Sequence, residues 1–280
     1  MSIRKGILYI VATPIGNLGD MSARAIETLS EVDLIAAEDT RHSLPLLRYF
    51  GITTPCIAYH DHNERQLSPE LIQRLLHGES IALISDAGTP LINDPGYHLV
   101  HQAREAGCQV VSIPGPSALI SALSVSGLPT HRFIFEGFLP ARTGLRKRRL
   151  EALCKEQGTL VFYESSHRIL ETLRDMVEVF GAGRQAVVAR EMTKIHETIQ
   201  GATLAELYDW VNRDKEQQRG EIVILIQGIV ESEVEGDTVE YERILHILME
   251  EMPLKQAVSI AARITGAKRN LLYDLAVKSN

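Results

Sequence analysis

The stretch IALISDAGTPLINDPG, residues 81–96, decides the fold. Its first four residues, Ile81 to Ile84, are apolar and include β-branched side chains, which predicts a buried parallel strand. The glycines and prolines that follow interrupt regular structure for about ten positions, which is long for a strand-to-helix connection. Ligands of open α/β sheets bind beyond the carboxyl ends of strands. The loop is therefore either a ligand cradle that carries Asp86 and Thr89, or a long turn that Asp86 and Asp94 cap.

The same strand-then-loop pattern recurs through the first half of the chain. Further strands are predicted at Ile7–Ala12, Leu34–Ala37, Cys56–Tyr59 and Val110–Ile113. Helical patterns lie between them, among them one that Ser22 can cap and one that starts near Ser117. Alternating strands and helices predict a parallel α/β sheet, which we assign to a domain over residues 1–128.

The second half repeats the alternation after Pro129. Strands are predicted at Phe133–Phe138, Leu160–Tyr163, Ala186–Ala189 and Glu221–Ile226, so residues 129–229 form a second α/β domain. Residues 230–242 are acidic without apolar periodicity and are interpreted as a linker. Residues 243–280 show three short helical patterns with basic side chains. They predict a helix-turn-helix-like tail that docks on nucleic acid or protein, or else helices that cap the body.

Composition narrows the class of protein. The chain has 280 residues, 45% of them hydrophobic, which is enough for two cores, and a net charge of -7. Such a charge excludes a protein that coats nucleic acid through bulk charge, but leaves room for a local basic patch. The three cysteines lack metal-site spacing, and the apolar run at the N-terminus is too short for a signal peptide or membrane span. We expect a cytoplasmic protein without a membrane segment.

Polar residues at other predicted strand ends are candidate substrate contacts. Arg41 follows the second strand, and its guanidinium matches the geometry of a phosphate. The third strand leads into His60 and Asn63, for which we expect polar contacts to a substrate. A metal site there is not favoured, because the histidines His60 and His62 have no further ligands nearby.

A basic segment stands out in this acidic chain. It contains Arg142, Arg146, Lys147, Arg148 and Arg149, with no acidic residue among them. Such a cluster favours a loop that contacts the phosphates of a nucleic acid. The alternative is the solvated start of a helix that runs to Glu156.

Six motifs together resemble the ribosomal small-subunit methyltransferase I family, of the tetrapyrrole-methylase class. They are LYIVATPIGNLGD, LIAAEDTR, ALISDAGTPLINDPG, IPGPSA, FYESSHRI and the ARE..K.HE segment, and they span nearly the whole chain. The resemblance implies two α/β domains that hold S-adenosylmethionine in the cleft between them, and a homodimer. It also implies 2′-O-methylation of the ribose of a decoding-centre cytidine in 16S rRNA, with the assembled small subunit as the substrate.

The resemblance also implies roles for particular residues. Residues that fall where members of the class contact the methyl donor are Pro14, Asp86, Thr89, Ser117 and Ala118, and we add the loop glycines Gly88 and Gly115. Asp86 can pair with the ammonium or ribose hydroxyls of the donor, and the helix N-terminus at Ser117 suits its polar atoms. The sequence Asn17-Leu-Gly-Asp replaces the Gly-Pro-Gly-Asp-type loop of tetrapyrrole enzymes, which favours the RNA branch.

Two other functions and the identity of the base remain open at this point. A tetrapyrrole-type methylase of small molecules would not need the basic segment or the tail, and a non-catalytic RNA-binding protein would not need the donor loops. Lys194 is the predicted general base, because burial beside Arg190 would lower its pKa. The alternatives are His196, Glu191, or a Lys194 that only contacts phosphate.

Overall fold

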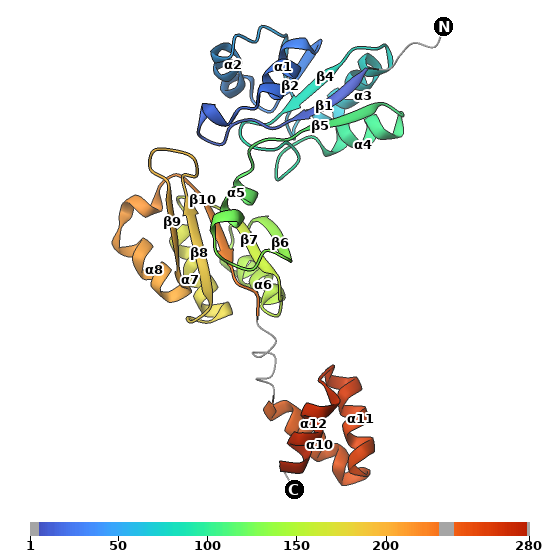
Figure 1. Ribbon diagram of the computed structural model, residues 1–280, viewed down its shortest axis with the longest axis vertical. Helices are drawn as coiled ribbons and strands as arrows, with labels where there is room; N and C mark the ends of the chain where they lie inside the picture. Colours follow the sequence, from blue (N-terminus) through green and yellow to red (C-terminus); the bar gives the residue numbers. More distant parts are fainter. Residues whose placement is uncertain (1–5, 230–237, 279–280) are drawn as a thin grey trace. The chain divides into compact units, whose positions relative to one another are not determined.

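The computed structural model describes residues 6–229 and 238–278. They fall into two units, which are described separately. The main body comprises the described residues up to 154 together with 158–227, and the C-terminal unit comprises 155–157 and the described residues from 228 onward. The main body contains two β-sheets with their helices, and the C-terminal unit contains three helices (Figure 1).

The first sheet is wholly parallel, as the sequence predicts. Its strands are β1 (Ile7–Val11), β2 (Leu34–Ala37), β3 (Cys56–Ala58), β4 (Ile81–Ile84) and β5 (Gln109–Ile113), in the order β3-β2-β4-β1-β5. The central strand β4 and its neighbour β2 are buried throughout, which explains their unbroken apolar runs.

Helices cover both faces of this sheet (Figure 1). They are α1 (Ala23–Glu31), α2 (Thr40–Tyr49), α3 (Glu64–Leu76) and α4 (Tyr97–Glu105), with a short 3₁₀ turn η1 (Leu18–Asp20) before α1. Leu29 of α1 and Leu47 of α2 pack in the core of one face, and Leu71 of α3 and Leu99 of α4 in the core of the other. Ser22 caps α1 as expected, since its side chain accepts the Ala25 N–H.

The second sheet is mixed. Its strands are β6 (Phe133–Phe138), β7 (Thr159–Ser165), β8 (Gln185–Arg190), β9 (Thr198–Thr203) and β10 (Glu221–Ile226), in the order β6-β7-β10-β8-β9. Only β6 and β7 pair in parallel, and the other three pairings are antiparallel. Helices α6 (Thr143–Leu153), α7 (Ile169–Phe180) and α8 (Leu204–Arg213) share a core on one face, and η2 (Lys215–Gln218) follows α8. Strand β9 is not among the predicted strands.

Helix α5 (Ala118–Val125) packs on the second sheet, not on the first (Figure 1). Leu119 and Leu123 of α5 share a core with Val161 of β7 and Val223 of β10. The chain therefore leaves the first half before α5. Helix α5, which the expected domain over residues 1–128 includes, thus buries its apolar face against the second sheet.

The C-terminal unit is a three-helix module, as the tail pattern predicts. Its helices are α10 (Thr238–Glu251), α11 (Leu254–Thr265) and α12 (Arg269–Lys278), around a core that includes Leu245, Val258 and Leu272. Gly266 ends α11 in the left-handed conformation, with φ of 74°. Residues 230–237 of the expected linker lie outside the described residues, and residues 238–242 belong to α10 rather than to a linker.

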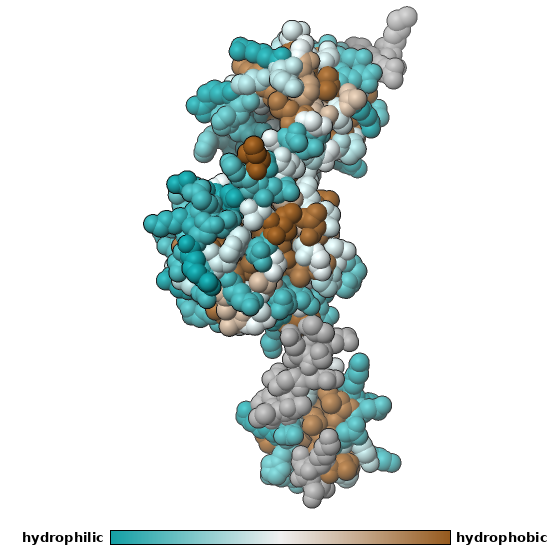
Figure 2. Space-filling view, turned by 60° about the vertical axis from the view of Figure 1, so that its left-hand side comes forward, coloured by the Kyte–Doolittle hydropathy of each residue, from teal (hydrophilic) through white to brown (hydrophobic). Residues whose placement is uncertain are grey.

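On the face that Figure 2 shows, many side chains are hydrophilic and apolar side chains gather in patches. Within the described ranges, no helix is both long enough and apolar enough to cross a membrane.

Candidate functional site

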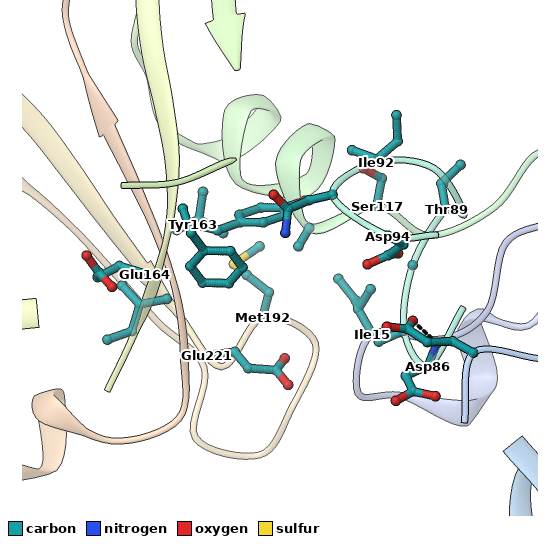
Figure 3. Close-up of a pocket in the computed structure, with 18 residues that line it drawn as sticks. Ile15, Asp86, Thr89, Ile92, Asp94, Ser117, Tyr163, Glu164, Met192 and Glu221 are labelled. Carbon is teal, nitrogen blue, oxygen red and sulfur yellow. Dashed lines mark hydrogen bonds between the residues drawn. The ribbon is translucent and has the colours of Figure 1, made fainter. Parts of the chain in front are cut away.

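A pocket with a volume of about 270 Å³ lies between the two sheets of the main body (Figure 3). The first half contributes side chains from loops that follow its strands: Ile15, Glu38, Asp86–Thr89 and Ile92–Asp94. The second half contributes the start of α5 and the facing strands: Ser117, Ala118, Phe138, Tyr163, Glu164, Met192 and Glu221–Val223. The predicted ligand loop after β4 thus forms one wall of a pocket.

Hydrogen bonds between loops hold this first wall in place. Thr13 and Gly88 exchange two backbone hydrogen bonds of 2.9 and 3.0 Å, and the Thr13 hydroxyl donates to the carbonyl of Ser85 at 3.1 Å. Gly88 has φ of 85°, a left-handed conformation that glycine adopts without strain. The Thr89 hydroxyl donates to the carbonyl of Pro116 at 3.0 Å. The ends of β1 and β4 and the segment that leads into α5 are therefore fixed to one another.

Asp86 is oriented by groups from the loop after β2. Its Oδ1 accepts the Asp39 N–H at 3.1 Å, and its Oδ2 lies 2.9 Å from Nδ1 of His42. The hydrogen bond and charge of Asp86 raise the pKa of His42. The Asp86 N–H donates in turn to Oε2 of Glu38 at 3.2 Å, shown dashed in Figure 3. The Asp86 side chain is 33% exposed, so its carboxylate can still accept hydrogen bonds from a ligand.

The pocket is acidic. Carboxyl groups line it from both halves: Glu38, Asp86, Asp94, Glu164 and Glu221. Burial, with the charges of neighbouring carboxylates, raises the pKa of Asp94 to about 7, and burial raises the pKa of Glu38. Between these carboxyls lie apolar side chains, including those of Ile15, Met192 and Val223. An apolar cavity surrounded by carboxylates suits an organic cation such as a sulfonium with an ammonium group.

The second wall depends on the antiparallel pairing of β7 with β10. This pairing places Val223 opposite Tyr163, and Ile222 opposite Glu164. The Tyr163 hydroxyl accepts the Leu119 N–H at the start of α5, at 3.2 Å, and burial raises the pKa of Tyr163. The wall is thus joined directly to the helix whose N-terminus opens on the pocket.

Glu164 is a fixed part of this wall. The Thr172 hydroxyl donates to its Oε2 at 2.6 Å, and the Ser165 N–H donates to its Oε1 at 2.7 Å. The FYESSHRI motif indicates the end of β7, but it does not by itself predict that Tyr163 and Glu164 line a pocket. The sequence around Met192 and Glu221 does not predict that they line a pocket, because only the fold of the second sheet brings them there.

Most of the expected donor-binding residues meet at the pocket. Asp86, Gly88, Thr89, Ser117 and Ala118 line it.

Pro14 and Gly115 do not line the pocket. Pro14 is buried beside Ile15, which does line it. A Cβ on Gly115 would lie 3.0 Å from Cβ of Ala12, so close packing accounts for the glycine there. Contact between the donor and any of these residues stays a prediction.

The expected substrate residues Arg41, His60 and Asn63 lie outside the pocket lining. Arg41 is highly exposed and forms a short ion pair with Asp39 at 2.6 Å. The Asn63 amide closes a turn, since its Oδ1 accepts the His60 N–H at 2.8 Å and its Nδ2 donates to the Ala58 carbonyl at 3.0 Å. With both ends of its amide engaged locally, Asn63 has a structural role in this conformation.

The basic segment is helical, so its prediction as a loop is wrong. Arg142 precedes α6, and the other four basic residues lie on it. Arg146 is fully buried, and its Nε donates to Oδ2 of Asp175 at 2.7 Å. The expectation that Arg146 contacts RNA is therefore wrong, because its guanidinium is part of the core.

The other basic residues of this segment lie nearer the surface. Lys147 pairs with Glu178 at 2.6 Å, and Arg149 pairs with Glu136 at 2.7 Å. Arg142 and Arg148 are exposed.

Lys194 does not line the pocket, but it contacts a residue that does. Its Nζ lies 2.9 Å from Oε1 of Glu191 and 3.2 Å from Oε2 of Glu221. Burial alone would lower the pKa of Lys194, but the hydrogen bonds and charges of the two glutamates outweigh burial and raise it. The prediction that burial turns Lys194 into a base is therefore wrong, because its neighbours are anions.

Comparison with known proteins decides the family. Residues 7–208 match the family described as Tetrapyrrole (Corrin/Porphyrin) Methylases. The chain is 56% identical over 274 residues to Ribosomal RNA small subunit methyltransferase I of Pseudomonas aeruginosa, covering 98% of this chain and 97% of the relative. The chain belongs to the ribosomal RNA small subunit methyltransferase I family. The relative of the same description from Escherichia coli O157:H7 is 52% identical, over 98% of this chain and 96% of that one.

Further comparisons agree with the architecture of this chain, which has two sheets and a C-terminal helical unit. Residues 235–279 match the RsmI C-terminal HTH domain. Uroporphyrin-III-C-methyltransferase from Thermus thermophilus superposes with a TM-score of 0.56 at 18% identity, over 80% of this chain and 94% of that one. A structure of a Thermus thermophilus uroporphyrin-III C-methyltransferase complexed with S-adenosyl homocysteine superposes with a TM-score of 0.54 at 17% identity. The match covers 79% of this chain and 97% of that one. At these identities the two structures show the shared fold alone.

Proposed function

We propose that this protein transfers a methyl group from S-adenosylmethionine to the 2′-oxygen of a cytidine ribose in the decoding centre of 16S rRNA. The assembled small subunit in the cytoplasm is its substrate. The observation that carries the proposal is an acidic pocket with apolar side chains between the two sheets, in a chain more than half identical over its whole length to a named rRNA methyltransferase.

The residues of the pocket suit the chemistry of the donor. S-adenosylmethionine supplies an electrophilic methyl group on a sulfonium that also carries an ammonium and a ribose. Asp86, held by Asp39 and His42, is placed to accept hydrogen bonds from such an ammonium or from ribose hydroxyls. The backbone N–H groups at the start of α5 serve polar atoms of the donor, because the Ser117 side chain does not cap that helix.

The acidic pocket also bears on how RNA would be held. Its carboxylates attract the cationic donor but repel phosphates, so phosphate contacts must come from elsewhere. The exposed Arg142 and Arg148, and the basic residues of the C-terminal unit, are the groups that we assign to RNA. Binding of the substrate and binding of the donor are thereby separated along the chain.

A homodimer is part of the proposal. Large apolar side chains that remain exposed on α5 and β6 are Ile120, Val125, Phe133 and Phe138. These side chains belong to elements of the second half that help form the pocket wall, and a second copy of the chain would bury them. Sedimentation of the protein should give the mass of a dimer, and charged substitutions at Ile120 and Val125 should give the mass of a monomer.

Methyl incorporation tests the reaction. Labelled donor should deliver methyl groups to assembled small subunits, less to free 16S rRNA and none to tetrapyrroles, with the label on a ribose 2′-oxygen after nuclease digestion. Asp86→Ala should weaken donor binding in calorimetry at least tenfold without unfolding the protein, because Asp86 lies in a loop and not in a core. Glu27→Ala, an exposed carboxyl on α1, is the matched control. Label on tetrapyrroles, or no label on RNA, would contradict the proposal.

A further inference from the structure

We propose that Ile195 inserts between bases of the rRNA beside the target cytidine and holds the target nucleotide out of its stack during methyl transfer. This inference rests on the proposed function, since it names the part of the RNA that meets the rim of the pocket. It concerns residues 191–197, which join β8 to β9 and are called the β8–β9 loop below.

Ile195 is the most exposed large apolar side chain in the described part of the chain. It is 93% exposed, whereas the next, Tyr49, is 67% exposed. Its neighbours in sequence, Lys194 and His196, are polar. Single exposed apolar side chains are common on protein surfaces, so exposure by itself assigns no role to Ile195. The structure of the loop that carries it does.

The β8–β9 loop is bent tightly and held at its start. Glu191 and Thr193 have left-handed φ values of 51° and 65°, which non-glycine residues adopt where surrounding structure forces them. The Glu191 N–H donates to the Glu221 carbonyl at 2.9 Å, and the Glu221 N–H donates to Oε1 of Glu191 at 2.9 Å. The loop therefore begins from a fixed backbone position beside β10.

The end of the loop is held as well. The Thr193 N–H donates to Oε2 of Glu197 at 2.6 Å, which closes the loop on itself. Arg190, which is buried, donates from Nη2 to the His196 carbonyl at 2.8 Å. Ile195 lies between these two contacts, so its exposed side chain is presented by an ordered backbone. Little conformational entropy is then lost when a partner covers that side chain.

Lys194 joins the loop to residues of the pocket. Its Nζ is paired with Glu191 and with Glu221, and Glu221 lines the pocket. A Cβ on Gly16 would collide with the Lys194 side chain, so that side chain lies against the segment that also carries the pocket residue Ile15. The residue next to Ile195 thus contacts both halves of the main body.

Ile195 consequently lies close to the rim of the pocket. Met192, three positions earlier, lines the pocket, and Figure 3 shows it with Glu221 on the side that the second half forms. The rRNA must pass this rim, because the reacting ribose has to reach the methyl group of a donor held in the pocket.

The chemistry of the loop tip favours a nucleobase over a phosphate. The Lys194 ammonium is already paired with two carboxylates, so the tip presents the apolar side chain of Ile195 beside a neutralised cation. Isoleucine is among the side chains that insert between base steps and unstack them. A nucleotide that stays stacked in its strand cannot reach into a pocket between two sheets, so it must be displaced. Ile195 fills the space that the displaced nucleotide leaves.

The position of the loop argues against a second copy of the chain as its partner. The strand order β6-β7-β10-β8-β9 places β8 and β9 away from β6, which carries the proposed dimer contacts Phe133 and Phe138. Sedimentation separates the two partners, since Ile195→Ser should have the same mass in solution as the wild type.

Single-turnover methylation of assembled small subunits tests the role of Ile195. At saturating subunits, Ile195→Ser should lower the rate by about tenfold or more, because it removes the group that replaces the displaced base. Its affinity for S-adenosylmethionine and its unfolding midpoint in urea should not change. Ile195→Leu, which keeps the apolar volume, should stay within about threefold of the wild type. Ile199→Ser, the same change on β9, is the matched control and should also stay within about threefold.

Fluorescence tests the displacement itself without turnover. An RNA fragment that carries the target cytidine, with 2-aminopurine directly 3′ to it, is saturated with the full-length protein and S-adenosylhomocysteine. The fluorescence of 2-aminopurine rises when its neighbour no longer stacks on it. The wild type and Ile195→Leu should therefore raise the signal, and Ile195→Ser should leave it near that of the free RNA.

Three results would overturn the assignment. They are a single-turnover rate of Ile195→Ser within about threefold of the wild type, an equal rise in fluorescence with the wild type and Ile195→Ser, and a smaller mass of Ile195→Ser in sedimentation. The last result would make Ile195 a contact between copies of the chain. A wild-type protein that places no label on RNA would instead contradict the proposed function.

Discussion

Arg146→Met should destabilise the protein without directly affecting RNA binding. Arg146 and Asp175 are both fully buried, and the 2.7 Å bond between them is the main interaction of the Asp175 carboxylate. After the substitution the nearest cation to Asp175 is Lys147, whose Nζ lies 3.9 Å from Oδ1. Removing one partner of a buried ion pair lowers the free energy of unfolding by about 3–5 kcal/mol. In a body of this size that corresponds to a fall in Tm of roughly 6–20 °C.

The single tryptophan provides the assay. Trp210 packs against the core that α6 and α7 share, so its fluorescence follows unfolding of that core. Arg148 lies two positions after Arg146 on the same helix and is exposed. Arg148→Met should therefore change the free energy of unfolding by no more than about 0.5 kcal/mol. Replacing both buried partners, by Arg146→Met with Asp175→Leu, should recover most of the stability. A loss below about 1 kcal/mol in Arg146→Met, or weaker subunit binding at unchanged stability, would refute the reasoning.

Three further outcomes follow from the structure. Arg142→Ser with Arg148→Ser should weaken subunit binding and reduce the salt slope of log affinity by about 2, measured by filter binding, whereas an unchanged slope would remove both from the RNA interface. Lys194→Met should keep single-turnover rates within about tenfold of wild type, because a protonated lysine is no base; a loss of about 10³-fold would contradict this. Asp94→Asn should stabilise the protein against urea by an amount that grows from pH 4 to pH 7 and then levels off. The reason is that the unfolded carboxyl ionises near its ordinary pKa while the folded one resists until about 7; a gain that shrinks with pH would be inconsistent with this.

The first half of the fold could be predicted from the sequence because its signals are local. Strands β2 and β4 are short apolar runs buried on both faces, and each ends in a polar loop at the same edge of a parallel sheet. The loop after β4 therefore had to lie near the loops after β1 and β5, and five of the seven expected donor residues line one pocket. The family resemblance supplies the choice of these residues, and the strand pattern explains why they lie near one edge of the sheet.

Charge alone misled the prediction for the basic segment. Four basic residues in a row on α6 suggested one surface, but a helix turns successive residues to different sides. Arg146 turns inward, where Asp175, 29 positions later on α7, neutralises it. Lys194 shows the same limit: its pKa depends on Glu221, which the antiparallel pairing of β10 brings within 3.2 Å. A residue's charge is in the sequence, but the partners that fix its role are distant in it.

The second wall of the pocket explains why the site needs both halves. A parallel sheet offers a ligand only the loops at its carboxyl edge, and in the first half those loops carry three carboxyl groups and the apolar Ile15 and Ile92. The second sheet is mixed, so the amino end of β10 lies beside the carboxyl end of β7, and Val223 and Ile222 stand beside Tyr163 and Glu164. Each wall therefore presents both carboxyl groups and apolar side chains, with Asp86 and Ile15 on the first and Glu221 and Val223 on the second. Burial in this pocket, together with the charges of neighbouring carboxylates of the first half, raises the pKa of Asp94.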